Sequence, residues 1–316
     1  MPLDFGIDLG FLKNRITFTA DYYVRKSTKL LLDAPLSSTS GFLTVRKNIG
    51  SLENRGIELD LKGVVIQKKD FSWEVGFNYA KNKNKVLKLP DGKDIINGLF
   101  IYREGFDVQS YYLRQYAGVD PANGDPLWFK DSTKSGTQNI YSSAQRLVSQ
   151  TASPKYFGSI NTTLKYKGFT LDAQFYYSGG NHSYDAFNSF YLGAGANPNF
   201  NKSSRILDRW QKPGDVTDIP KYIFNGNKSF NQASSFYLND GTYVRLRNLQ
   251  LGYSLPTAVA SKLKLTSGFF YVRGTNLFTW VKDKNQPFDP EQGASSRSNL
   301  NELIPRTVSA GLNIGF

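Results

Sequence analysis

The sequence contains no cysteine, and it has a single histidine, His182, among 316 residues. Without cysteine there are no disulfides, which argues against the secreted proteins of animals, since these usually carry them. One histidine excludes metal sites built from several histidines, and it also argues against serine–histidine catalysis. The sequence therefore predicts a protein that is not an enzyme and that holds no metal and no cofactor.

Long apolar runs are missing as well. No stretch approaches the roughly 18 consecutive apolar residues that a membrane helix needs. No charged and apolar leader precedes the first strand pattern at Phe5, so the chain shows no signal peptide of its own. We expect a piece of a longer exported protein.

Aromatic residues are abundant at 15%, with 19 Tyr and 23 Phe. Aromatic and β-branched side chains suit pleated strands. The dominant pattern is an alternation of apolar and polar residues, as in Phe71, Trp73, Val75, Phe77 and Tyr79 against intervening polar or small residues. The same period of two occurs over residues 5–11, 16–24, 57–62, 160–166, 169–177, 243–253, 269–278 and 306–316. The chain is thus predicted to be all-β.

Three further features favour a membrane barrel over a soluble sandwich. The predicted strands run about 9–13 residues, which suits a tilted membrane strand better than the usual soluble one. Aromatic residues gather near strand ends, where an interfacial girdle would lie. Connections alternate between short (12–14, 67–70, 167–168) and long (26–53, 83–154, 180–237), and outer-membrane barrels have short periplasmic turns and long external loops. We predict an antiparallel transmembrane β-barrel, with residues 1–316 as a single domain.

The strand count depends on one long segment. Residues 83–154 are either a single external loop or contain an extra hairpin, with Gln109–Val119 and Pro126–Lys130 as its strands. The first alternative gives nine strands and the second eleven. Bacterial barrels have an even number, so either count predicts a partial barrel. Residues 255–265 are long for an inner turn and are predicted to form a short helix.

The net charge of +13 does not by itself identify a partner. The basic residues are scattered, and the densest run is Lys81–Lys85, which we interpret as solvated surface. Binding of single-stranded nucleic acid would need aromatic residues interleaved with Lys and Arg on one face. Here the aromatics alternate mostly with Asp, Glu, Ser, Thr and Gly, so no nucleic-acid partner is predicted.

Several blocks, in this order, resemble the SusC/RagA family of TonB-dependent outer-membrane transporters. The first is Asn48–Leu61, "NIGSLENRGIELDL". Others are "YAGVDPANGDPLWF" (116–129), "PKYFGSINTTLKYKGFTLDAQFYYSGGN" (154–181), "RILDRWQKPGDVTDIPKY" (205–222), "DGTYVRLRNLQLGYSLP" (240–256), "FFYVRGTNLFTW" (269–280) and "PRTVSAGLNIGF" (305–316). The similarity covers essentially the whole chain.

The resemblance implies the C-terminal portion of a plugged barrel of roughly 22 strands, crossing a Gram-negative outer membrane several times. It implies import of large nutrients, typically oligosaccharides, powered by TonB. The implied partners are a SusD-like surface lipoprotein, TonB through the missing N-terminal region, and the barrel-assembly machinery. The plug and the N-terminal domain would lie upstream. A passive porin or a surface adhesin remains the alternative.

Two kinds of candidate site follow. Phe316 is an aromatic C-terminus on an alternating strand, and it is predicted to be a signal for the barrel-assembly machinery; the alternative is an ordinary lipid-facing residue. Aromatic residues of the external loops are candidate platforms for sugar rings: Trp128, Tyr184, Tyr191 and Trp210. The alternative for each of these is packing within the loops themselves.

Overall fold

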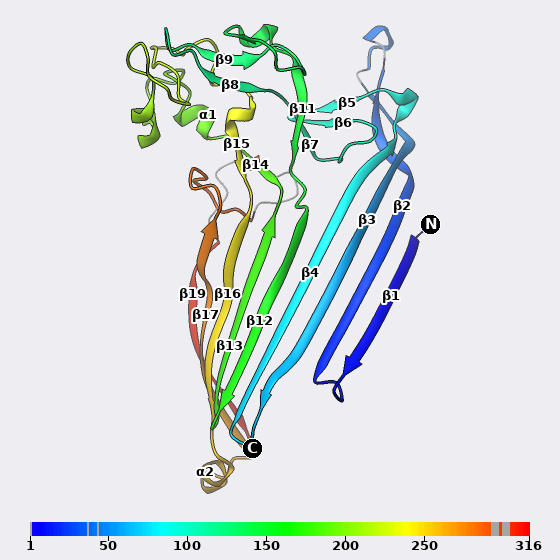
Figure 1. Cartoon of the computed structure of the whole chain (residues 1–316), viewed down its shortest axis with the longest axis vertical. Coiled ribbons are helices and arrows are strands. Elements are labelled where there is room, and N and C mark those ends of the chain that lie inside the picture. The colour runs from blue at the N-terminus through cyan, green and yellow to red at the C-terminus, as the bar shows by residue number, and fades with distance from the viewer. Residues whose placement is uncertain (1, 37, 43, 292–296, 299–303) are drawn as a thin grey trace.

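The computed structural model describes residues 2–36, 38–42, 44–291, 297–298 and 304–316. Within these residues the main sheet has nine antiparallel strands (Figure 1). In sheet order they are β1 (Pro2–Phe11), β2 (Ile16–Pro35), β3 (Thr44–Gln67), β4 (Phe71–Lys88), β12 (Tyr156–Tyr166), β13 (Phe169–Gly179), β16 (Tyr243–Ser254), β17 (Ser267–Val281) and β19 (Thr307–Gly315). The all-β prediction and the count of nine are confirmed.

The register aligns apolar positions across the whole sheet. Phe18 lies opposite Leu9 on one side and Leu61 on the other, and Leu61 lies opposite Phe77. Phe77 in turn lies opposite Ile160. Because side chains alternate between the faces of a strand, this register places the predicted apolar residues on one face and the polar residues on the other. We refer to these as the apolar face and the polar face.

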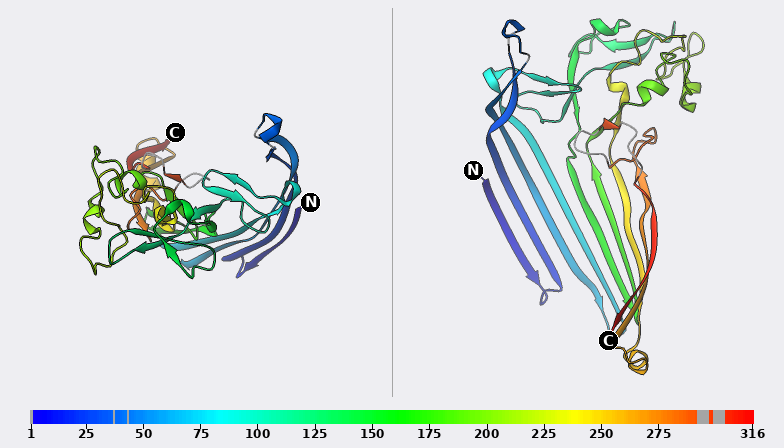
Figure 2. Two further views of the ribbon diagram at one scale, coloured as in Figure 1. Left: turned by 90° about the horizontal axis from the view of Figure 1, so that it is seen from above. Right: turned by 180° about the vertical axis from the view of Figure 1, so that it is seen from behind.

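The sheet is curved, and seen from above it forms an open arc (Figure 2). Strands β5 (Ile95–Asn97) and β6 (Phe100–Tyr102) extend into the inner side of this arc. Asn84 belongs to the polar face, and its Oδ1 accepts a hydrogen bond from the Val108 amide, in the segment after β6, at 3.0 Å. The polar face is therefore the concave one. The apolar face is convex and leaves large hydrophobic side chains such as Phe77 and Phe175 exposed.

Short turns and the C-terminus lie together at one end of the sheet (Figure 1). In the turn after β12, Lys167 and Gly168 both have positive φ, of 45° and 90°, as a tight two-residue hairpin requires. The predicted short helix is present as α2 (Thr257–Lys262). No helix of the described residues is both long and apolar enough to cross a membrane.

Two predicted long loops differ from the structure. Most of residues 26–53 are strand, since β2 continues to Pro35 and β3 begins at Thr44. The eleven-strand alternative is wrong, because β7 (Ser110–Arg114), β8 (Tyr116–Val119) and β9 (Pro126–Phe129) form small sheets outside the main one. These strands are short, so they pair with their near neighbours instead of spanning the barrel wall.

The remaining elements lie at the loop end, in three small sheets. One has the order β11-β7-β6-β5, one β10-β9-β8 and one β15-β14-β18. Their further members are β10 (Thr137–Gln138), β11 (Arg146–Thr151), β14 (His182–Asp185), β15 (Leu238–Asp240) and β18 (Arg297–Ser298). The helices here are α1 (Asn188–Tyr191) and 3-10 turns at Ser38–Ser40, Pro90–Gly92, Tyr141–Ser143, Ser204–Asp208 and Ser235–Tyr237.

Candidate functional site

The polar face is covered by hydrogen bonds between side chains of neighbouring strands. Thr19 Oγ1 donates to Asp8 at 2.6 Å, and Thr163 Oγ1 donates to Asp172 at 2.7 Å. Further pairs join Asn78 with Ser159, Asn248 with Gln174, and Arg273 with Gln250. A concave face with donors and acceptors at every strand can line a water-filled passage and contact a polar solute.

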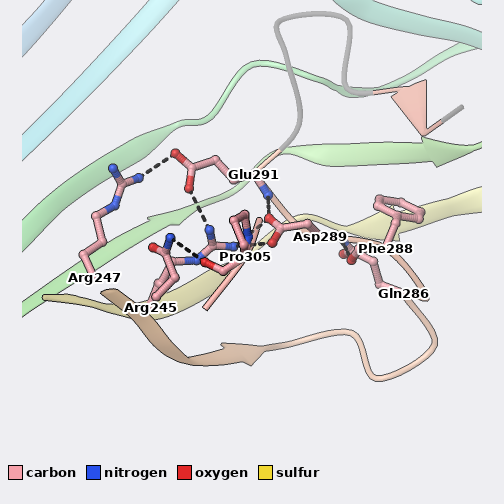
Figure 3. A network of polar contacts seen from close by, with 8 residues as sticks. Arg245, Arg247, Gln286, Phe288, Asp289, Glu291 and Pro305 are labelled. Atoms are coloured by element: carbon pink, nitrogen blue, oxygen red, sulfur yellow. Dashed lines mark hydrogen bonds and ion pairs between the residues drawn. The ribbon is translucent and has the colours of Figure 1, made fainter. Parts of the chain in front are cut away.

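Near the upper end of the polar face, two arginines of β16 bind two carboxylates of the segment after β17 (Figure 3). Arg245 Nη2 lies 2.6 Å from Asp289 Oδ1, and Arg245 Nη1 lies 3.2 Å from Glu291 Oε2. Arg247 Nη2 lies 2.5 Å from the other oxygen of Glu291. Glu291 thus bridges the two arginines, and the segment 283–291 is held against the wall.

The two arginines differ strongly in burial. The Arg245 side chain is 1% exposed, whereas those of Arg247 and Glu291 are each 34% exposed. Arg245 also lies over the Tyr243 ring at 5.5 Å, and Arg247 lies over the Tyr176 ring at 4.1 Å. A buried arginine must be paired, because an unpaired charge in a low-dielectric site is costly. Arg245 is therefore the anchor of this network.

A separate aromatic core lies in the segments at the loop end of the sheet. Tyr111, Leu113, Ala152, Tyr184 and Tyr237 are buried together. Burial raises the pKa of Tyr111 and Tyr237 above the ordinary tyrosine value, so both are neutral hydrogen-bond donors. Tyr237 donates to the Phe230 carbonyl at 2.8 Å.

Asp185 lies beside this core, just before α1. Its Oδ1 accepts hydrogen bonds from the amides of Phe187 and Asn188, at 2.9 and 2.8 Å. Its Oδ2 is buried and has no partner among the described residues. Burial raises the pKa of this carboxyl, even though the two amides oppose that shift.

The four aromatic candidates occupy different parts of the loop region. Trp128 is fully buried between Tyr116 and Tyr141. Tyr184 is buried in the core described above, and the largely buried Trp210 donates its indole N–H to the Pro121 carbonyl at 3.1 Å. Tyr191 is half-buried at the end of α1. The structure does not bring the four rings to a common surface, and this packing supports the loop-packing alternative for the three buried ones.

Phe316 follows β19 at the short-turn end of the sheet, and it is 91% exposed. The described part of the chain offers no test of a role for its ring. Its part in assembly therefore stays a prediction.

Sequence reasoning missed the arginine–carboxylate network. The available signal was Arg245 and Arg247 at a spacing of two within an otherwise largely apolar strand. Their partners lie 44 and 46 residues away along the chain, and no local pattern identifies such a pair. Within the described part of the chain, no group of His, Cys, Asp or Glu residues is arranged to hold a metal ion.

Comparisons with known proteins agree with this architecture. No family model matches the chain. TonB-dependent receptor P3 of Formosa agariphila is 32% identical over 99% of the chain and 34% of its own length. TonB-dependent receptor SusC of Bacteroides thetaiotaomicron is 26% identical over 98% of the chain and 31% of its own length.

A solved structure of the RagAB peptide transporter superposes with a TM-score of 0.88 at 29% identity, covering all of this chain and 35% of that one. The chain thus spans about a third of the length of these relatives. Its fold matches part of the β-barrel of a TonB-dependent transporter, and the sheet does not close on itself within the described residues. By sequence and by fold, the chain belongs to the SusC/RagA family of TonB-dependent receptors.

Proposed function

We propose that this chain forms part of the barrel wall of a transporter that imports a large nutrient across the outer membrane of a Gram-negative bacterium. In this role the chain has no enzymatic activity. Residues 1–316 act as one domain, in which the nine strands line the passage and the loop-end sheets form its external mouth.

The observation that carries this proposal is the division of the sheet into two faces. The convex face presents apolar side chains such as Phe5, Phe77 and Leu251, all of them exposed in the isolated chain. Exposure of so much apolar surface indicates contact with lipid or protein. The concave face presents hydrogen-bonded polar side chains. An outer-membrane barrel needs this arrangement, with lipid outside and water inside.

The proposed cargo is a large polar molecule, with an oligosaccharide as the first choice. The name of the RagAB relative refers to a peptide, so a peptide is the second choice. The proposed partners are a SusD-like surface lipoprotein above the loops and TonB below the barrel. Tyr191 is the one aromatic candidate that is partly exposed, and we propose it as a contact for the cargo. Phe316 is proposed as the recognition residue for the barrel-assembly machinery.

Uptake experiments in cells test the proposal directly. The gene for the full-length protein is deleted, and growth is measured on a panel of oligosaccharides and peptides as sole nutrients. Loss of growth on one of them, restored by the intact gene, identifies the cargo. Uptake that survives deletion of TonB would identify a passive porin instead. Absence of the protein from purified outer membranes would refute the proposal.

A further inference from the structure

The most basic run of the sequence, Lys81–Lys85, lies near the top of β4. The alternation that began at Phe71 continues through it without a bulge in β4. Lys81, Lys83 and Lys85 therefore belong to the apolar face. The two asparagines between them belong to the polar face.

Hydrogen bonds fix this orientation. Asn84 Nδ2 donates to Asn54 Oδ1 at 2.9 Å, and Asn82 Nδ2 donates to the same oxygen at 3.2 Å. Tyr23 donates its hydroxyl proton to Asn82 Oδ1 at 3.2 Å. With the two asparagine side chains held inward in this way, the three lysines that alternate with them must point outward.

The lysines continue directly from the aromatic edge of the apolar face. The stretch Phe71–Tyr79 measures about 26 Å along the strand, or about 20 Å of depth at a tilt of about 40°. This is close to the apolar band of about 25 Å of such barrels. Lys81 comes next on the same face and lies opposite Tyr156. Lys81 and Lys83 thus lie at the height of the lipid headgroups.

Neighbouring strands add to the positive charge at this height. Arg55 of β3 lies opposite Lys83, and Lys26 of β2 lies opposite Glu53. Among the described residues that lie opposite one another at this height on the apolar face, Glu53 is the one carboxylate. It lies 3.5 Å from Lys26 and 3.9 Å from Arg55. No ion pair in the described part of the chain involves the three lysines of β4. Five cations against one anion leave a net charge of +4.

We propose that this basic collar (Lys26, Arg55, Lys81, Lys83 and Lys85) binds the phosphate groups of anionic lipids in the membrane leaflet next to the external loops. The outward direction and the headgroup height select a lipid over a soluble anion, because the collar continues an apolar surface that lipid chains would cover. The positive charge of the collar matches the negative charge of the lipid phosphates. The inference rests on the proposed position of the sheet in a membrane but not on the identity of the cargo.

The test uses the full-length protein, purified in detergent, with the triple substitution Lys81→Ser, Lys83→Ser and Lys85→Ser. Native mass spectrometry measures the Kd of the first phosphatidylglycerol molecules bound, with phosphatidylcholine as the uncharged comparison. Each basic residue near a charged membrane surface contributes about 1 kcal/mol, which corresponds to about fivefold in Kd. We expect the triple variant to bind phosphatidylglycerol about a hundred times more weakly, with binding of phosphatidylcholine unchanged. High salt should reduce this difference, because it screens exposed charges.

A matched variant removes the same charge from the external loops: Lys130→Ser, Lys212→Ser and Lys228→Ser. All three are exposed, and their removal should leave lipid binding unchanged. Equal weakening in both variants would overturn the proposal, since net charge would then be the cause. An unchanged Kd in the β4 variant would also overturn it, as would displacement of the lipid by inorganic phosphate at a similar concentration. If the triple variant fails to fold, Lys83→Gln alone should still weaken binding severalfold. Nutrient uptake is measured in a separate experiment. A failure of the proposed transport function can therefore be distinguished from a failure of the proposed lipid binding by the collar.

Discussion

Replacement of Arg245 by leucine should release the segment 283–291 from the barrel wall. The Arg245 side chain is 1% exposed and that of Asp289 is 12% exposed, so their pair is buried. Loss of one partner from a buried pair costs about 3–5 kcal/mol, because the remaining charge is left without compensation. Arg247 and Glu291 are each 34% exposed, and solvent screening limits an exposed pair to about 1 kcal/mol. Arg247→Leu is therefore a matched control of much smaller effect.

Hydrogen exchange of the full-length protein measures this difference locally. A cost of about 3 kcal/mol corresponds to amide exchange about 150 times faster in residues 283–291. The Arg247 variant should change exchange by less than about fivefold. Exchange in β12 and β13 should be unaffected in both variants. The reasoning would be refuted by equal acceleration in the two variants, or by no acceleration in the Arg245 variant.

Four further changes test other parts of the structure. Val75→Arg puts a charge in the apolar face and should cost about 2–4 kcal/mol in folding into lipid vesicles, whereas Glu74→Arg on the polar face should be tolerated; equal losses would contradict the assignment of faces. Gly158→Val should destabilise the barrel, because a Cβ there would meet a neighbouring tyrosine ring and a backbone carbonyl; an unchanged thermal unfolding temperature would argue against this packing. Burial raises the pKa of Asp185 above 3.8, so its folded form binds a proton more readily than the unfolded chain; loop stability should be greatest at acid pH and fall as the pH rises through that raised value. Asp185→Asn should flatten this dependence in hydrogen exchange of residues 182–192, and a persistent slope would point to another group. Deletion of Phe316 should reduce outer-membrane levels of the full-length protein without reducing its synthesis, and normal levels would leave it a plain exposed residue.

The strands of the wall could be predicted from sequence because their signal is local. Residues such as Phe71, Trp73 and Val75 show the period of two within a few positions, and neither partner strands nor loops are needed to see it. The tight turn at Lys167–Gly168 is equally local, because these residues adopt the positive φ values that it requires.

The ends of the strands were harder to predict. Beyond Val24 the apolar alternation stops, yet β2 continues to Pro35 because it pairs with β3. Strand continuation there depends on a partner and not on the residues alone. For the same reason, the sequence left open whether β7 to β9 join the wall.

The functional side chains depended almost entirely on tertiary structure. Trp128 and Trp210 have the flat aromatic rings that a sugar platform needs. Only the packing of loops that are distant in the sequence determines that the faces of these rings are covered. The anchoring role of Arg245 exists because the chain returns after β17 to place Asp289 beside it.

The sequence by itself determined that the chain forms long two-faced strands. Successive side chains of a strand point to opposite faces, so the pattern can be recognised from consecutive residues alone. The sequence also predicted the short turns that follow β1, β3 and β12, whereas the long connection expected over residues 26–53 is mostly strand. Only the tertiary structure decided which face is concave, how far the strands extend above the apolar band, and which charges meet. Those features arise from contacts between residues far apart in the chain, and a sequence pattern carries no information about where such residues meet.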